Sequence, residues 1–341
     1  MEQVACPISP YPMATLGPYT LTGKTLFEGN GCEILEAIYT SGVDGHAAPT
    51  SDAGRGIDVT HHDGTLWAIK IKNDNHYDIR YLEKLKGVRN CVEVPADSAA
   101  FTGRLPDGRT WYRCSPTDAS GHLLESSSIA IAPQVDTKQY PPGAQWYAMR
   151  KYDDTVDNHK AFSRDRWQQI ARDVLQFLQD THARRLAHLD IKAFNILYDA
   201  THNCFRVCDF EHMTEADDFD DDPLHTYDAE HAWYYAMLGG DMSKPYESYR
   251  MDLEALGFVL SMLTWPANKP IRFLREYECR MREEMTILTV EETLELRKRE
   301  IAAGAPPALA SYFAAIQEVA WDTEESPPPE FYERLRGLFV E

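Results

Sequence analysis

The sequence predicts an α+β protein of two lobes, with a β-rich N-terminal lobe and a larger, mainly α-helical C-terminal lobe. Short apolar runs bounded by turn residues, which are typical of strands, recur up to residue 152. From residue 162 onward, apolar residues recur at the spacing of amphipathic helices. A chain of 341 residues, 43% of them hydrophobic, can bury a large core. A two-lobed enzyme or a pair of domains is the simplest organisation for this length.

The composition limits the partners and the compartment. The formal net charge of −20 repels phosphate backbones, so we expect no direct nucleic-acid partner, whereas a basic protein would be attracted. The seven cysteines are irregularly spaced, and neither a secretory leader nor an apolar run of membrane-spanning length occurs. We therefore expect reduced cysteines in a cytoplasmic or nuclear protein that is not secreted and has no membrane partner. The oligomeric state stays open.

The N-terminal lobe is expected at residues 20–149, after a proline-rich and loosely held arm at residues 1–19. Residues 20–39 predict two strands around a turn at residues 27–32. Residues 40–63 are small and polar and predict a loop insertion. Residues 102–143 are polar and interrupted by Pro and Gly, so they predict a second loop insertion with one strand at residues 109–114.

Two apolar strands of this lobe carry candidate site residues. Lys70 lies in the strand at residues 66–71, and Met149 lies in the strand that begins at residue 146. Between them, Leu82 and Leu85 share one face of a helix, one turn after Asp78. Taken alone, Lys70 is an ordinary strand lysine, Met149 a core residue and Asp78 a surface charge. If a carboxylate of this helix pairs with Lys70, Glu83 is the alternative to Asp78, although it falls beside the leucines rather than one turn before them.

The C-terminal lobe is expected at residues 150–341. A long amphipathic helix precedes His182, and a second helix starts near Met251 and runs through residue 263. Thr289 and Glu292 form a capping box for a third helix, which ends at Gly304. Residues 307–321 and 331–339 form two further amphipathic segments.

The most informative stretch is residues 188–197, which read H-x-D-x-K-x-x-N-I-L. This spacing resembles the catalytic loop of protein kinases, in which the acid takes the proton of the attacking hydroxyl, the lysine holds the phosphate and the asparagine binds a metal. A short strand at residues 205–208 leads into Asp209-Phe210-Glu211, which resembles the kinase D-F-G motif without its glycine. A single Asp is usually a cap or turn residue, but the two motifs together favour catalysis.

The turn at residues 27–32 resembles a degraded kinase phosphate loop. Gly29 keeps the second glycine, Gly31 adds a different one, and Ile34 takes the position of the valine that covers the adenine. Two glycines still let the backbone approach a phosphate, although a plain hairpin turn explains them about as well.

With these pieces placed, the chain resembles the vaccinia-related kinases, a branch of the casein kinase 1 group. The resemblance covers roughly residues 20–339. It rests on Asp190-Ile191-Lys192-Ala193 with Asn195, on F-S-R at residues 162–164, on D-L-E-A-L-G at residues 252–257 and on Y-E-R-L-R at residues 332–336. It implies a two-lobed protein-kinase-like fold, with a small antiparallel β lobe and a larger helical lobe, and a Ser/Thr protein kinase that uses ATP and Mg²⁺.

The same resemblance assigns the site residues. The catalytic residues would be Asp190, Lys192, Lys70 and Asp78, the last as the partner of the lysine that anchors the phosphates. The metal ligands would be Asn195 and Asp209. The nucleotide would contact Gly29, Gly31, Ile34, Ala68, Lys70, Met149, Lys151, Tyr152 and Leu197. Asp252 would hydrogen-bond the backbone of the catalytic loop from below.

Departures from the family pattern keep two alternatives open. Glu211 replaces the D-F-G glycine and the phosphate loop has lost two glycines, which favour a pseudokinase that binds nucleotide or protein. A small-molecule phosphotransferase is less favoured, since such enzymes generally lack a lysine at the position of Lys192.

Leu189 replaces the arginine that receives an activation-loop phosphate in the family, so activity is not expected to depend on such a phosphorylation. The acidic run at residues 215–222 is either a solvated loop or a device that attracts basic substrates.

Overall fold

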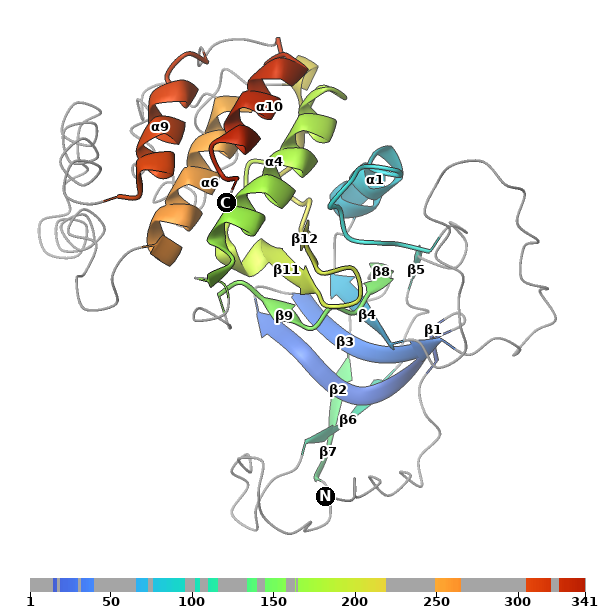
Figure 1. Cartoon of the computed structure of the whole chain (residues 1–341). Helices are drawn as coiled ribbons and strands as arrows, with labels where there is room; N and C mark the ends of the chain where they lie inside the picture. Colours follow the sequence, from blue (N-terminus) through green and yellow to red (C-terminus); the bar gives the residue numbers. More distant parts are fainter. Residues whose placement is uncertain are drawn as a thin grey trace, which may run out of the picture. The chain divides into compact units, whose positions relative to one another are not determined.

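The computed structural model describes residues 15–16, 19–29, 32–39, 66–72, 76–95, 102–104, 110–115, 134–139, 145–157, 163, 165–218, 249–264, 305–319 and 325–340. The chain divides into two compact units (Figure 1). The first unit comprises residues 1–87 and 92–151, and the second comprises residues 88–91 and 152–341.

The first unit is built on a six-stranded sheet in the order β1-β2-β3-β4-β8-β5, in which all neighbouring strands are antiparallel. Its strands are β1 (Thr15–Leu16), β2 (Tyr19–Gly29), β3 (Cys32–Tyr39), β4 (Leu66–Lys72), β5 (Thr102–Arg104) and β8 (Gln145–Arg150). β2 and β3 form the expected hairpin, but its strands run further than expected, since Phe27 pairs with Ile34 and Gly29 with Cys32. Helix α1 (His76–Lys84) follows β4 and buries Leu82, and Leu85 just beyond it is also buried.

One face of this sheet forms an apolar core because alternate residues of each strand point to the same side. The core residues are Leu16, Tyr19, Leu21, Leu35, Ala37, Trp67, Ile69, Ile71, Trp146 and Ala148. The ring of Tyr19 meets those of Trp67 and Trp146 edge to face, with centroids 5.8 and 6.1 Å away. The opposite face is therefore left for the alternate residues, among them Ala68 and Lys70.

Two expectations about the N-terminal region are corrected. The loosely held arm ends in strand β1, and Leu16 and Tyr19 are buried in the core. The described parts of the insertion at residues 102–143 form three strands rather than one: β5, β6 (Thr110–Ser115) and β7 (Gln134–Gln139). β5 pairs with β8, and β6 pairs with β7, which follows it much later in the chain. Such strands are stabilised by distant partners, so their local sequence does not reveal them.

The second unit is mainly helical, as expected. Its helices include α4 (Trp167–His182), α6 (Tyr249–Thr264), α9 (Pro307–Ile316) and α10 (Pro329–Gly337). Helix α4 contacts both α6 and α10, and α6 also contacts α9 (Figure 1). The helix expected between Thr289 and Gly304 lies outside the described residues. In the part of the chain that is described, no helix is long and apolar enough to span a membrane.

Short strands in the second unit frame the segment at residues 188–195. Strand β10 (Leu186–Ala187) precedes it and pairs with β13 (Thr214–Glu215). The 3₁₀ turn η1 (Ala193–Asn195) ends it and leads into β11 (Ile196–Asp199), which lies between β9 (Asp154–Thr155) and β12 (Cys204–Val207). The turn η2 (Ala216–Asp218) follows β13. Both ends of the segment are thus fixed by strand pairing.

Candidate active site

The segment at residues 188–195 brings three predicted site residues together. The Asp190 carboxylate is buried, and its Oδ2 accepts hydrogen bonds from Asn195 Nδ2 at 2.8 Å and from Lys192 Nζ at 2.8 Å. The Asn195 amide also donates to the backbone oxygen of Asp190 at 3.0 Å. The carboxylate is therefore held in one orientation by two donors from its own loop.

The backbone of this loop is held by a carboxylate from helix α6. Leu189 has a φ of 61°, a left-handed conformation that a branched side chain rarely adopts. Asp252 Oδ1 accepts from the N–H of Leu189 and Asp252 Oδ2 accepts from the N–H of His188, each at 2.7 Å. The expected contact of Asp252 with the loop is thus confirmed, and it offsets the strain at Leu189.

His188 connects the loop to the segment that follows β12. Its Nε2 lies 3.1 Å from the carbonyl oxygen of Cys208, which can only accept, so Nε2 carries the proton. Its Nδ1 accepts from the N–H of Asp190 at 3.2 Å. The imidazole ring also meets the ring of Phe210 edge to face, with centroids 5.7 Å apart. His188 therefore ties the loop of Asp190 to the residues on both sides of Asp209.

The residue before Asp209 is hydrogen-bonded to Asn195. The N–H of Cys208 donates to the backbone oxygen of Asn195 at 3.0 Å, and Asp209 itself has a φ of 67°. Phe210 is fully buried and stacks on Phe177 of α4, with centroids 6.4 Å apart. Because the Asn195 amide nitrogen donates to Asp190, its oxygen remains as a ligand atom. An amide oxygen and a carboxylate are ligands that suit Mg²⁺, so these residues fit the predicted metal.

Four predicted nucleotide residues share one face of the sheet in the first unit. Ile34 on β3 pairs with Lys70 on β4, and Ala68 on β4 pairs with Met149 on β8. Directly paired residues of antiparallel strands point to the same side, so all four lie opposite the apolar core. Lys70 is buried, and its Nζ lies 5.9 Å from the centre of the Tyr147 ring.

Two other residues predicted to contact the nucleotide, Lys151 and Tyr152, are engaged by neighbouring side chains. Lys151 Nζ lies 2.6 Å from Glu36 Oε2, so this lysine is engaged by a carboxylate. Burial would raise the pKa of Glu36, but the hydrogen bond and charge of Lys151, with Lys24, lower it overall. Tyr152 belongs to the second unit, where it is buried beneath the Arg206 guanidinium, 5.7 Å from its ring centre.

The remaining predicted site residues are described only in part. Leu197 is half-buried in β11, and Gly29 ends β2. Gly31 and the side chain of Asp78 lie outside the described residues, although α1 includes the backbone of Asp78. The rival residue Glu83 is exposed on α1.

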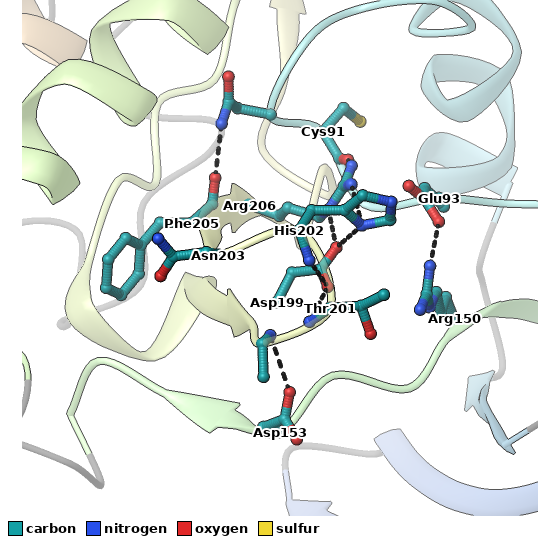
Figure 2. A network of polar contacts seen from close by, with 12 residues as sticks. Cys91, Glu93, Arg150, Asp153, Asp199, Thr201, His202, Asn203, Phe205 and Arg206 are labelled. Atoms are coloured by element: carbon teal, nitrogen blue, oxygen red, sulfur yellow. Dashed lines mark hydrogen bonds and ion pairs between the residues drawn. The ribbon is translucent and has the colours of Figure 1, made fainter. Parts of the chain in front are cut away.

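Sequence reasoning missed a polar network around the hairpin of β11 and β12. Figure 2 shows Asp199, His202 and Arg206 directed toward one another, with Asp199 Oδ2 2.7 Å from His202 Nδ1 and 2.8 Å from Arg206 Nε. Arg206 Nη1 donates to the carbonyl of Cys91 at 3.0 Å. Burial would raise the pKa of Asp199, but its bonds to His202 and Arg206 lower it overall. No motif marks these residues, because their role is to hold residues 88–91 against β12.

A comparison with protein-family models agrees with the chemistry of the loop. Residues 144–300 match the family model of the protein kinase domain, and the match includes Asp190, Lys192, Asn195 and Asp209. This match supports a protein kinase and a kinase-like fold. A comparison with curated proteins gave no match.

Proposed function

We propose that this chain is a Ser/Thr protein kinase that transfers the γ-phosphate of ATP with Mg²⁺. The observation that carries the proposal is the orientation of the buried Asp190 carboxylate by Lys192 and Asn195, in a loop anchored on Asp252. The protein kinase match over residues 144–300 supports it. The vaccinia-related branch is a finer proposal and rests on the sequence motifs alone.

Asp190 is the base of this mechanism. Both of its loop donors contact Oδ2, and among the described residues none donates to Oδ1, so this oxygen can accept the proton of a substrate hydroxyl. Lys192 reaches the same carboxylate and can follow the phosphoryl group as it transfers. Asn195 and Asp209 would hold Mg²⁺. When bound, the metal supplies positive charge that stabilises the β- and γ-phosphates. Lys70 would anchor the α- and β-phosphates.

Glu211 favours a second candidate, a pseudokinase that binds nucleotide without transferring phosphate. This half-buried side chain takes the position of a glycine two residues after Asp209 and adds negative charge beside the proposed metal ligands. A small-molecule phosphotransferase is disfavoured by the contact of Lys192 with Asp190, since such enzymes generally lack this lysine.

The substitution Asp190→Asn tests the proposal. The variant should bind Mg²⁺-ATP with nearly unchanged affinity but lose about 10²- to 10⁴-fold in transfer rate, because the amide cannot take the hydroxyl proton. Transfer of labelled phosphate to histone, followed by phosphoamino-acid analysis, measures the rate and the acceptor residue.

Asp165→Asn is the matched control, since it removes the same charge from an exposed position of the second unit. Normal transfer by Asp190→Asn would refute the mechanism, and phosphotyrosine as the product would refute the Ser/Thr assignment. A wild-type protein that binds Mg²⁺-ATP but transfers nothing to any protein would establish the pseudokinase instead.

A further inference from the structure

A buried chain of hydrogen bonds joins the C-terminal helix α10 to the catalytic loop. The Tyr332 hydroxyl contacts His182 Nδ1, and His182 Nε2 lies 3.0 Å from Asp252 Oδ2. That same oxygen accepts from the N–H of His188 at 2.7 Å. The side chains of His182, Asp252 and Tyr332 are at most 1% exposed, so water does not substitute for these bonds. The hydroxyl on α10 is thus two side chains away from the loop backbone.

The directions of these bonds follow from the chemistry of the groups. A carboxylate only accepts, so the proton between His182 and Asp252 lies on Nε2 of the imidazole. In the neutral form of the ring, Nδ1 is an acceptor and the Tyr332 hydroxyl donates to it. Burial, with the nearby charge of Asp252, raises the pKa of Tyr332 well above its usual range, so the phenol keeps its proton. Asp252 thus sets the tautomer of His182, and the Tyr332 hydroxyl on the other nitrogen helps to fix the orientation of the ring.

Helix α10 holds this hydroxyl in place because it packs along α4. Arg336 Nη1 donates to Gln179 Oε1 at 2.7 Å, and Leu335 is fully buried. Just beyond the helix, the buried ring of Phe339 meets that of Trp167 edge to face at 5.6 Å, and the Arg172 guanidinium contacts the backbone oxygen of Phe339. These contacts follow Tyr332 in the chain, so its position depends on the docking of the last turn of α10 and of the residues just beyond it.

We propose that Tyr332 is a positioning residue for catalysis and that α10 sets the geometry of the catalytic loop through it. This inference rests on the proposed function, since it assigns Tyr332 an effect on Asp190. The strained backbone at Leu189 depends on Asp252, and Asp252 shares its Oδ2 between His182 and His188. When His182 loses its donor, its ring is free to reorient, and the carboxylate that holds the loop loses a fixed partner. The loop then samples conformations in which Asp190 is misplaced.

The substitution Tyr332→Phe removes only the hydroxyl and tests the inference. We expect kcat to fall about three- to tenfold while KM for ATP and for the protein substrate stays unchanged, the effect of one lost hydrogen bond on a positioned base. Amide hydrogen exchange at residues 188–190, followed by mass spectrometry, should become faster. This second measurement does not require activity, so it separates failure of the inference from failure of the proposed function.

Tyr312→Phe is the matched control. Tyr312 is also fully buried on a neighbouring helix, α9, and its hydroxyl donates to the carbonyl of Leu253 at 2.6 Å rather than to the histidine. It should lose comparable stability without a change in kcat or in exchange at residues 188–190. If both variants changed kcat and loop exchange equally, or if neither changed them, Tyr332 would be an ordinary structural residue and the inference would be overturned.

Discussion

At the scale of single residues, surroundings rather than residue type separate the acids of the second unit. Asp190 is held by two donors of its own loop, and bonds to His202 and Arg206 lower the pKa of Asp199. Asp173 on α4 is different. Its Oδ2 accepts from the N–H of Phe205 at 2.8 Å, yet burial raises its pKa from 3.8 to about 6. The ionised form of Asp173 therefore lowers the free energy of unfolding rather than raising it.

The raised pKa of Asp173 predicts a stabilising substitution. The folded state binds its proton more tightly than the unfolded state, so this residue lowers the free energy of unfolding progressively from about pH 4 to about pH 6. Asp173→Asn keeps an oxygen for Phe205 and removes the charge. Thermal unfolding should show a melting temperature a few degrees higher than wild type at pH 7, a gain of at most about 3 kcal/mol, and no difference near pH 4.

The exposed Asp165→Asn variant shows what the loss of one surface charge does by itself. A melting temperature of Asp173→Asn at or below that of wild type at pH 7 would mean that the ionised form of Asp173 is stabilising.

At the scale of elements, helix α6 has two tasks on two sides. Asp252 on its first turn holds the backbone of the loop at residues 188–195, while Gly257 lies against α9. A Cβ added at Gly257 would come within 2.7 Å of Cε1 of Phe313 and 3.1 Å of Cε1 of Tyr312. The absence of a side chain at this position lets the two helices approach closely.

Gly257→Ala should therefore destabilise the protein, although alanine is the better helix former. Helix propensity favours alanine by about 1 kcal/mol, whereas forcing a methyl into a packed interface costs about 1–3 kcal/mol. We expect a net loss of about 1 kcal/mol, seen as a lower urea midpoint with an unchanged slope. Gly337→Ala is the control, because a Cβ at Gly337 would meet nothing within 4 Å. If both variants were stabilised, Phe313 and Tyr312 of α9 would have to shift at little cost to accommodate the added methyl group.

At the scale of the whole molecule, the net charge of −20 acts on approaching substrates. The acidic run at residues 215–222 adds a local concentration of this charge, although Asp217 forms an ion pair with Arg185. The side chains of the rest of its aspartates lie outside the described residues.

We predict that basic substrates such as histone are preferred over acidic ones such as casein, and that salt reduces the preference because it screens charge beyond about 8 Å. Replacing the four aspartates at positions 218, 220, 221 and 222 by Asn should also reduce it, mainly through KM. The control removes four exposed acids elsewhere: Asp165, Glu325, Glu330 and Glu333. An equal effect of both sets would assign the preference to net charge alone, and a preference for casein would contradict the prediction.

The local sequence determined much of this protein. Short apolar runs predict the strands that carry Lys70 and Met149, and the helical spacing predicts α4, α6 and α10. The spacing of Asp190, Lys192 and Asn195 predicts that they share one short loop, and the structure adds that they contact one another there. Properties that depend on neighbours along the chain can be read in this way.

Only the tertiary structure decided which distant residues support that loop. Leu16 and Tyr19 belong to the core, and β5 exists because β8 lies beside it. Tyr332 reaches His182 across 150 residues of sequence, and nothing in the pattern around either residue indicates the contact. The physical reason is that hydrogen bonds and packing act through space, where the fold brings together groups that are far apart in the chain.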